Sequence, residues 1–353
     1  MPTSDNTTTR VVVTGGCGFI GSNLIHYLLR KHPEWEVINF DSLTYAASQE
    51  NLAGLEEEPR YRFIRLDITD RDAVRDALRE LNPHGIFHLA AESHVDNSIR
   101  GPEQFVLTNV VGTFNLLEEA RQIWGRDDRK RFLHVSTDEV YGSLGESGAF
   151  SETTQYAPNS PYSASKAGSD HLVRAWHHTY GMNVVITNCS NNYGPRQHRE
   201  KLIPTVIATA LRGEPIPVYG QGINVRDWLY VIDHCEAIDM VFTGGRSGES
   251  YVIGGRNEWR NIDLVRSICT LLDEEIGGGP QGGYQSLITF VTDRPGHDAR
   301  YAIDPSKIEN ELGWYAATSF HEGLRETVRW YGTTTDLRSA MDGETSGVRE
   351  SRA

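Results

Sequence analysis

An apolar run that ends in a glycine-rich turn constrains the fold of this chain more than any other feature. Residues 11–21 read Val-Val-Val-Thr-Gly-Gly-Cys-Gly-Phe-Ile-Gly, which predicts a strand, a tight turn and the start of a helix in direct succession. Glycines in such a turn let backbone amides approach a pyrophosphate, and the helix N-terminus favours its charge. The pattern therefore predicts a dinucleotide-binding turn.

An acidic residue at a fixed distance from this turn indicates which dinucleotide binds. Asp41 follows Gly21 by twenty residues, at the end of the next apolar run. A carboxylate in that position can accept hydrogen bonds from both hydroxyls of a ribose. Because the same carboxylate would repel a 2′-phosphate, the sequence favours NAD over NADP.

Short β-rich runs alternate with helical stretches through the first two-thirds of the chain. The runs are residues 11–13, 37–40, 63–66, 86–89, 132–135 and 184–187, and the longest helical stretches lie near 103–123 and 161–180. Such alternation predicts an α/β fold with a doubly wound, Rossmann-like parallel sheet, whose ligands bind at the carboxyl ends of the strands. We expect an NAD-binding domain that carries the catalytic residues over residues 10–190, a smaller C-terminal substrate-binding lobe over 191–331 and a disordered tail over 332–353.

The charge balance and the cysteines argue against several classes of function. The chain has 34 Lys and Arg against 48 Asp and Glu, a formal net charge of -14, which opposes unspecific binding to nucleic acid or anionic lipid. No apolar run approaches the roughly 20 residues of a membrane span, and residues 1–9 are polar, so we expect a cytoplasmic protein. The four cysteines are scattered without a Cys-x-x-Cys pair, so the sequence indicates neither a disulfide framework nor a metal site.

Two groups of polar residues indicate redox chemistry coupled to an elimination. Tyr162 and Lys166 lie four residues apart on one helical face, so the ammonium can lower the pKa of the phenol, which can then take a proton from an alcohol while hydride leaves. This chemistry has no use for a neighbouring acid and base, so Asp138 and Glu139 imply a second event. Strand neighbours point to opposite faces, so both can reach one substrate only from an irregular or helical turn. In the alternative interpretation, Asp138 caps a short turn and Glu139 is solvated.

Several motifs together resemble the extended short-chain dehydrogenase/reductase superfamily. They are Gly15-x-x-Gly18-x-x-Gly21, Tyr162-x-x-x-Lys166 and the alternation of strands and helices. Stretches that are similar to the dTDP-glucose 4,6-dehydratase branch are residues 43–46, 90–96, 136–142, 200–204, 224–228 and 293–298. The resemblance covers about residues 10–330. It implies an NAD-dependent hydro-lyase that oxidises C4 of dTDP-glucose, eliminates water across C5 and C6, returns hydride to C6 and releases dTDP-4-keto-6-deoxyglucose.

The resemblance also implies roles for five catalytic residues. Tyr162, as a phenolate helped by Lys166, removes the proton of the 4-hydroxyl, and Thr137 hydrogen-bonds that oxygen. Glu139 removes the proton from C5, and Asp138 donates a proton to the departing 6-hydroxyl. Two adjacent carboxyl groups can serve opposite roles only if their surroundings separate their pKa values, with the acid kept protonated by burial or by its neighbour's charge.

The resemblance implies two sets of binding residues. The cofactor set is Gly15, Gly18, Phe19, Ile20, Gly21, Asp41, Thr44, Asp67, Ile68, Ala90, Ser93, Thr108, Ser136, Tyr162 and Lys166. The substrate set is Ser93, Thr137, Asn191, Lys201, Leu202, Pro217, Tyr219, Arg226, Asn261, Arg294, His297 and Tyr301. Lys201, Arg226 and Arg294 are the candidates for the diphosphate, since fixed cations bind it. Two residues keep alternatives: Asp67 is an equally good helix N-cap, and His297 either approaches the diphosphate or bonds within its own loop.

The resemblance further implies a homodimer, because relatives pair the helices near 103–123 and 161–180 across a two-fold axis. The plain alternative is that the apolar positions of these helices pack onto the sheet. Other functions also stay open: a UDP- or CDP-glucose 4,6-dehydratase, a nucleotide-sugar 4-epimerase that has no use for the acid and base, a decarboxylase that uses Glu139 without Asp138, and a non-catalytic NAD-binding protein.

Overall fold

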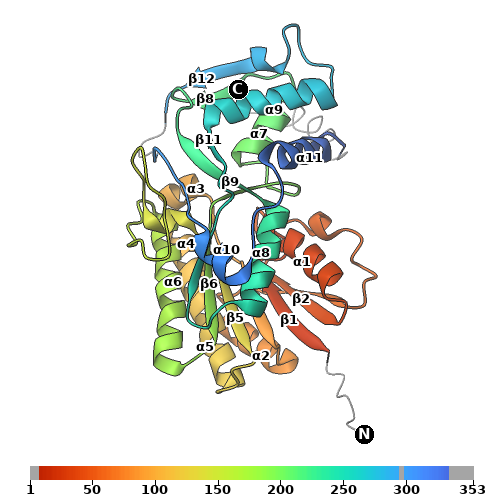
Figure 1. Ribbon diagram of the computed structural model, residues 1–353. Helices are drawn as coiled ribbons and strands as arrows, with labels where there is room; N and C mark the ends of the chain where they lie inside the picture. The colour runs from red at the N-terminus through yellow and green to blue at the C-terminus, as the bar shows by residue number, and fades with distance from the viewer. Residues whose placement is uncertain (1–7, 294–297, 334–353) are drawn as a thin grey trace, which may run out of the picture.

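A parallel sheet of seven strands lies at the centre of the molecule, in the order β10-β6-β5-β4-β1-β2-β3 (Figure 1). The computed structural model describes residues 8–293 and 298–333. The strands of this sheet are β1 (Thr9–Thr14), β2 (Trp35–Asp41), β3 (Tyr61–Arg65), β4 (Gly85–His88), β5 (Arg131–Thr137), β6 (Val184–Cys189) and β10 (Ser250–Ile253). The predicted α/β class and the parallel sheet are confirmed.

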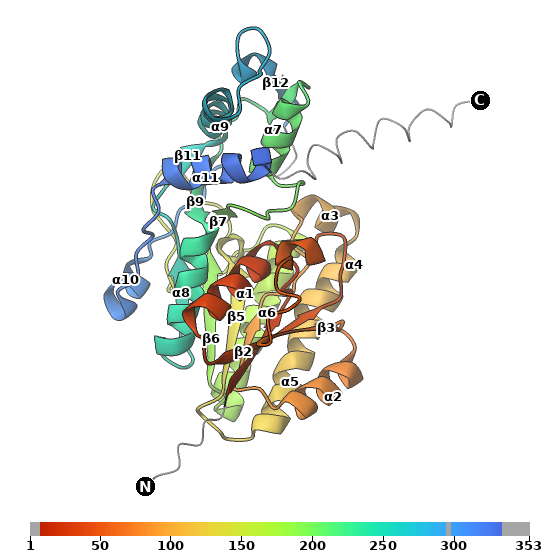
Figure 2. The same cartoon turned by 90° about the vertical axis from the view of Figure 1, so that its right-hand side faces the viewer.

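Helices cover both faces of the sheet, which explains why its strands are apolar runs without alternation. Val11 and Val13 of β1 pack with α1 (Phe19–Lys31) and α8 (Val231–Gly244). Val12, which points the other way, packs on the face covered by α2 (Arg71–Leu81), α5 (Thr113–Trp124) and α6 (Pro161–Tyr180). All three valines are fully buried. Figure 2 shows α8 and α5 on opposite sides of the strands.

The helix that carries Tyr162 and Lys166 begins and ends as its sequence predicts. Ser160 caps α6 by accepting a hydrogen bond from the backbone N–H of Ser163, and Pro161 occupies the first turn, where its missing N–H costs nothing. Gly181 ends the helix in a left-handed conformation. The catalytic face of α6 is therefore held at both ends by local sequence.

The predicted helix near 103–123 is one continuous helical run with a π-helical segment in its middle. Helix α4 (Pro102–Phe105) is followed by the π-helical segment η2 (Val106–Gly112) and then by α5. A Cβ atom on Gly112 would lie 2.5 Å from Ile68 Cδ1, so η2 approaches the third strand's loop more closely than a larger residue would allow. Short 3-10 or helical turns complete this half of the molecule: η1 (Gln49–Leu52), α3 (Val95–Arg100) and η3 (Asp138–Tyr141).

A second hydrophobic core belongs to a smaller lobe, at the top of Figure 1. Its strands are β7 (Asn191–Tyr193), β8 (Ile216–Tyr219), β9 (Val225–Tyr230), β11 (Glu258–Arg260) and β12 (Ile288–Val291). Its helices are α7 (Leu202–Leu211), α9 (Asn261–Glu275) and α11 (Phe320–Thr333), with the 3-10 turn η4 (Tyr284–Leu287), while α10 (Ser306–Leu312) packs on α8 and β10. The chain returns from this lobe to add α8 and β10 to the large sheet, so residues beyond 190 contribute to both bodies.

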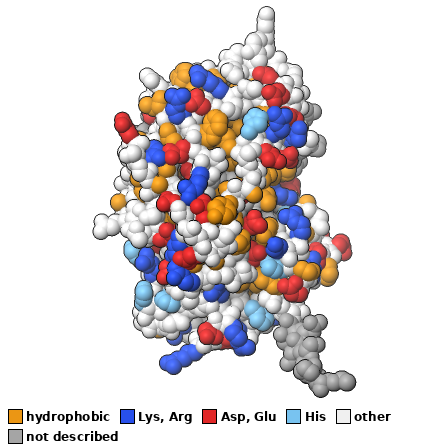
Figure 3. Space-filling view, viewed as in Figure 1, with side chains coloured by type: hydrophobic (Ala, Val, Ile, Leu, Met, Phe, Trp, Pro, Cys, Tyr) orange, Lys and Arg blue, Asp and Glu red, His pale blue; other side chains and the backbone are white. Residues whose placement is uncertain are grey.

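The predicted domain bounds at 190 and 331 stay predictions. Helix α11 reaches Thr333, and the rest of the predicted tail lies outside the described residues. Acidic and basic side chains are interspersed on the face seen in Figure 3. Within the described part of the chain, each helix falls short of the length and apolarity that a bilayer crossing requires.

Candidate active site

The carboxyl ends of the central strands open onto one crevice, as the strand order predicts. Every residue named from the sequence as catalytic or cofactor-binding lines this crevice. Of the substrate set, Ser93, Thr137, Asn191 and Lys201 also line it. The fold therefore brings together residues that span the sequence from 15 to 201.

The glycine turn forms a cradle that side chains would fill. Gly15 has φ +72, and a Cβ on it would lie 2.8 Å from the backbone of Ala90. A Cβ on Gly21 would lie 2.2 Å from the carbonyl oxygen of Gly15, so helix α1 can pack against the turn only with glycine there. Gly18 begins α1 without a side-chain cap. The helix N-terminus thus faces the crevice with its backbone donors, which fits the pyrophosphate of a dinucleotide.

Asp41 ends β2 in the crevice and is almost fully buried. Its carboxylate accepts hydrogen bonds from the backbone N–H of Cys17 at 2.9 Å and of Leu43 at 2.7 Å. Burial raises the pKa of this carboxyl, and the two backbone donors oppose the rise. These two hydrogen bonds fix the orientation of the Asp41 carboxylate at the edge of the crevice, as the predicted contact with a ribose requires.

The alternative role of Asp67 as a helix cap is wrong. Asp70 caps α2 by accepting a hydrogen bond from the backbone N–H of Ala73 at 3.1 Å. Asp67 instead accepts hydrogen bonds from the N–H and the hydroxyl of Thr69, at 2.9 and 2.8 Å, and lines the crevice. An adenosine contact for Asp67 stays a prediction.

The catalytic tripeptide leaves strand β5 in a helical turn, as both carboxylates require. Thr137 is the cap of η3, because its hydroxyl accepts a hydrogen bond from the N–H of Glu139 at 3.3 Å. Asp138 and Glu139 form the first turn of this 3-10 helix, and both line the crevice. The alternative that Asp138 is the cap is wrong, since Thr137 fills that position.

The surroundings of Asp138 favour a protonated carboxyl. The side chain is 2% exposed, and its Oδ2 atom has no hydrogen-bond partner among the described residues. Burial raises the pKa of Asp138 well above its ordinary value, and the charges of Glu139 and Asp227 raise it further, while Arg226 lowers it. The predicted condition for an acid beside a base is thus met by the structure.

The predicted effect of Lys166 on the pKa of Tyr162 stays a prediction. Burial raises the pKa of the Tyr162 phenol well above its ordinary value, and the charge of Glu139 adds to the rise. Lys166 is directed elsewhere: its Nζ donates to the carbonyl of Val135 at 2.9 Å and lies 3.4 Å from Nε2 of His134. A positive charge near the phenol lowers such a raised pKa toward the range in which a tyrosine acts as a base.

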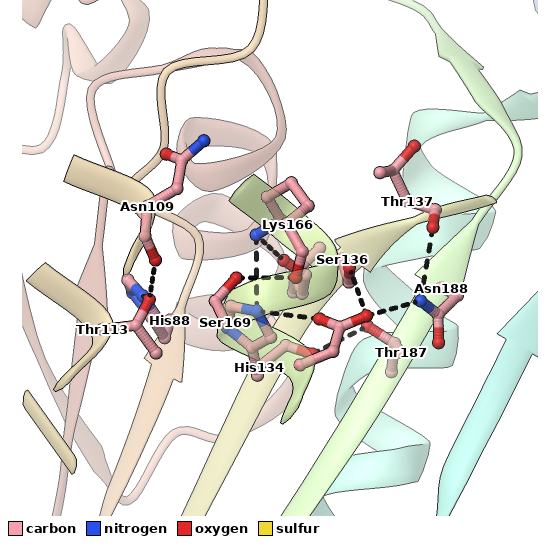
Figure 4. Close-up of polar contacts among 12 residues, drawn as sticks. His88, Asn109, Thr113, His134, Ser136, Thr137, Lys166, Ser169, Thr187 and Asn188 are labelled. Atoms are coloured by element: carbon pink, nitrogen blue, oxygen red, sulfur yellow. Dashed lines mark hydrogen bonds and ion pairs between the residues drawn. The ribbon is translucent and has the colours of Figure 1, made fainter. Parts of the chain in front are cut away.

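A buried polar network includes His134, Ser136, Lys166 and Asn188 (Figure 4). Sequence reasoning missed its central residue, Asp170. Asp170 is fully buried, and its Oδ2 accepts hydrogen bonds from the Ser136 hydroxyl at 2.9 Å and the Asn188 amide at 3.1 Å. Its Oδ1 lies 3.2 Å from Nε2 of His134. The available signal was spacing: Asp170 follows Lys166 by one helical turn and shares its face.

The predicted substrate residues separate into two groups. Asn191 lies in the crevice, and its Oδ1 has no hydrogen-bond partner among the described residues. Lys201 donates to the carbonyl of Ser93 at 3.2 Å and precedes Leu202, the first residue of α7. These residues place a cation and an amide on the side of the crevice that faces the smaller lobe.

The other described substrate residues lie in the smaller lobe, outside the lining of the crevice. Pro217 and Tyr219 are exposed on β8, and Asn261 begins α9. Arg226 is buried; its Nη2 donates to the carbonyl of residue 298 at 3.0 Å, and its guanidinium lies 4.4 Å from the ring centre of Tyr301. Substrate contacts for these residues stay predictions. Arg294 and His297 lie outside the described residues.

Comparisons with known proteins agree with this geometry. The family model for GDP-mannose 4,6 dehydratase matches residues 12–327. A Sinorhizobium fredii protein named "Probable dTDP-glucose 4,6-dehydratase" is 57% identical over 327 residues, which cover 91% of this chain and 92% of that protein. A crystal structure of dTDP-glucose 4,6-dehydratase from Streptomyces venezuelae, with NAD and dTDP bound, is 47% identical with a TM-score of 0.86, covering 94% of this chain and 100% of that one.

A more distant neighbour shares the fold with a different printed activity. The UDP-glucose 4-epimerase of Thermotoga maritima, crystallised with UDP-glucose, has a TM-score of 0.82 at 29% identity and covers 93% of this chain and 100% of that one. The fold alone therefore leaves the reaction open, and the residues of the site have to distinguish the two activities.

Proposed function

The chain belongs to the GDP-mannose 4,6 dehydratase family, and from this premise we propose that it is a dTDP-glucose 4,6-dehydratase. It converts dTDP-glucose to dTDP-4-keto-6-deoxyglucose and water and is an NAD-dependent hydro-lyase. One observation carries the proposal: a buried carboxyl whose surroundings keep it protonated, Asp138, stands next to Glu139 on the same turn, beside Tyr162 and Lys166. The first step needs only Tyr162 and Lys166, whereas elimination needs the acid and the base as well.

The first step is removal of the 4-hydroxyl proton by Tyr162. When bound, NAD adds a positive charge beside the phenol, takes hydride from C4 and later returns it at C6. That charge opposes the burial that raises the pKa of Tyr162. Thr137 lines the crevice next to the carboxyl groups of Asp138 and Glu139. Its hydroxyl hydrogen-bonds the 4-oxygen of the sugar as that oxygen becomes a carbonyl.

Elimination follows because a proton next to a carbonyl is far more acidic than one next to an alcohol. Glu139 takes the proton from C5, and Asp138 gives its proton to the 6-hydroxyl, which leaves as water. Both side chains reach the same crevice because η3 replaces the alternating geometry of a strand. The hydride that returns to C6 makes this carbon a methyl group, and a proton returns to C5.

The preference for dTDP-glucose over UDP- or CDP-glucose is supported by the relatives and not by a contact to the nucleobase. The relatives at 57% and 47% identity carry the dTDP-glucose name over more than nine-tenths of the chain. Lys201 and Arg226, together with Arg294, hold the diphosphate in this proposal, since their cations offset its charge. Asn191, whose Oδ1 is unpartnered among the described residues, contacts the sugar.

A comparison of three substrates tests the proposal. Purified protein is incubated with dTDP-, UDP- and CDP-glucose, and the products are measured by mass spectrometry. We expect loss of one water from dTDP-glucose at a kcat/KM at least about tenfold above the other two, since one well-made polar contact is worth about that much. A product of unchanged mass with the galactose configuration would instead establish an epimerase.

The protein also forms a homodimer in this proposal. Five exposed apolar side chains lie on α3, η2 and the end of α6: Ile99, Val106, Leu107, Val111 and Tyr180. Exposed apolar side chains of this kind form a surface that a second copy of the chain can cover. Light scattering should give twice the 39.5 kDa of the chain, and Val106→Glu should lower that mass. A monomer at micromolar concentration would contradict the dimer.

A further inference from the structure

The side chain of Asp170 contacts residues from several parts of the candidate site. Its Oδ2 accepts three hydrogen bonds, from Ser136 at the end of β5, from Asn188 near the end of β6 and from the hydroxyl of Tyr156 at 2.9 Å. Its Oδ1 lies 3.2 Å from the ring of His134, whose Nε2 is 3.4 Å from Nζ of Lys166. Figure 4 shows the side chains of His134, Ser136, Lys166 and Asn188 close together.

Most of this cluster is buried, and Tyr156 is partly buried. Asp170 and His134 are fully buried, and Lys166 is 4% exposed. A buried ammonium and a buried carboxylate are each costly alone, so each requires the other or a set of hydrogen bonds. Burial lowers the pKa of Lys166 to about 8, and Asp170 is the largest influence that opposes this.

The other titratable groups around Lys166 compensate less than Asp170 does, although Cys189 also raises the pKa of Lys166. They are His88 on β4, His134 on β5, Cys189 on β6, Tyr162 on α6, and Asp138 and Glu139 on η3, of which the last two act on Tyr162. Burial lowers the pKa of His134 to about 4 and that of His88 well below its ordinary value, so both rings are neutral near pH 7. Burial raises the pKa of the Cys189 thiol to about 12.

The hydrogen bonds of Asp170 also decide which atoms Ser136 and Asn188 can offer. Ser136 uses its hydroxyl proton on Asp170, so its oxygen presents only lone pairs to the crevice that it lines. Asn188 uses its amide protons on Asp170 and on the carbonyl of Thr137, at 3.2 Å. The backbone beside the catalytic hydroxyl of Thr137 is thereby tied to the same carboxylate.

We propose that Asp170 is a positioning residue for the reaction: its buried carboxylate is the counter-ion that keeps Lys166 charged, and it orients Ser136 and Asn188 at the ends of the two strands that frame Tyr162. This role rests on the proposed function, but the state of Lys166 can be measured without any substrate. A failure of the positioning role can therefore be told apart from a failure of the proposed function.

The sequence offers a clean measurement, because the chain has five lysines: Lys31, Lys130, Lys166, Lys201 and Lys307. The NAD-loaded protein is labelled with [ε-13C]lysine, and each signal is followed by NMR as a function of pH. Lys166→Arg assigns the signal of interest by removing it. In Asp170→Asn the Lys166 signal should titrate about one pH unit or more below its wild-type midpoint, since a close opposite charge shifts a pKa by that much.

A matched variant separates charge from packing. Tyr156→Phe removes one hydrogen bond to Asp170 and leaves the carboxylate charged, so the Lys166 midpoint should stay within a few tenths of a unit. The alkaline limb of the pH profile of kcat should move with the NMR midpoint in Asp170→Asn and stay in place in Tyr156→Phe. Equal Lys166 midpoints in wild type and Asp170→Asn would overturn the proposal. Should Asp170→Asn fail to fold, the wild-type signal decides: a Lys166 that is charged at pH 7 agrees with a counter-ion, and a neutral one overturns it.

Discussion

Two buried carboxyl groups near the candidate active site differ in the direction in which their surroundings shift the pKa. Asp138 on η3 and Asp170 on α6 are 2% and 0% exposed. The pKa of Asp138 is raised well above its ordinary value, first by burial and then by nearby anions. Burial would raise the pKa of Asp170 too, but His134, Lys166 and Ser136 outweigh it and lower the pKa.

The difference lies in what surrounds each carboxyl, since burial is equal. Asp170 accepts three hydrogen bonds and has a cation beyond His134. Asp138 has a single contact, 3.3 Å from the Thr137 hydroxyl, and its Oδ2 is unpartnered within residues 8–293 and 298–333. The same residue type thus has surroundings that favour the protonated form at Asp138 and the ionised form at Asp170.

The largest expected effect is on catalysis at Asp138. Asp138→Asn keeps the shape but removes the transferable proton, so loss of water should slow by about 100-fold or more, the usual contribution of a general acid. Oxidation at C4 should be slowed much less, and a 4-keto sugar that retains its 6-hydroxyl should accumulate and be trapped for mass spectrometry. Equal slowing of oxidation and water loss would remove the acid role from Asp138.

The next largest effect is on stability at Asp170. Its folded pKa is depressed, so its contribution is present above the unfolded pKa and is lost as the pH falls through the folded one. Asp170→Asn should lower the free energy of unfolding at neutral pH by about 3 kcal/mol, because it leaves Lys166 buried without its counter-ion. Tyr156→Phe should cost only about 1 kcal/mol.

Urea unfolding at matched NAD content measures both Asp170 effects. The penalty of Asp170→Asn should shrink on acidification below the unfolded pKa of an aspartate. A penalty of equal size at acid and neutral pH would mean that packing, and not charge, is what Asp170 supplies.

The smallest expected effect is a gain in the free energy of unfolding, on replacement of Asp138. Asp138 has a raised folded pKa, so it costs stability at every pH above its unfolded value, and the cost grows until the folded pKa is passed. Asp138→Asn should therefore raise the free energy of unfolding at neutral pH by about 1 to 2 kcal/mol, since one pKa unit is worth about 1.4 kcal/mol. A loss of stability in this variant, measured by the same urea titration, would contradict the ionisation states assigned here.

Features that depend on local sequence were predictable. The glycine turn, the strand ends and the bounds of α6 follow from apolar periodicity and from caps such as Ser160 and Gly181. The need for a turn at Asp138 and Glu139 followed from strand geometry alone, and η3 satisfies it. In each case the information lies within a few residues of the feature.

Features that depend on distant partners were not predictable. Strand β10 is four residues long and lies more than sixty residues beyond β6, its only neighbour in the large sheet. The contacts of Lys166 with Val135 and His134 join it to another element, so no pattern near Lys166 in the sequence indicates them. Asp170 carries a signal in its spacing from Lys166, but its role depends on Ser136, Asn188 and Tyr156, which only the fold brings near.

The fate of the hydrogen on C4 tests the central claim most directly. Substrate with deuterium at C4 of the glucose is converted to completion in ordinary water, and the product is examined by NMR and mass spectrometry. Oxidation at C4 followed by elimination and return at C6 predicts one deuterium in the product's methyl group. Deuterium that stays on C4, or that is missing from the methyl group, would contradict the account.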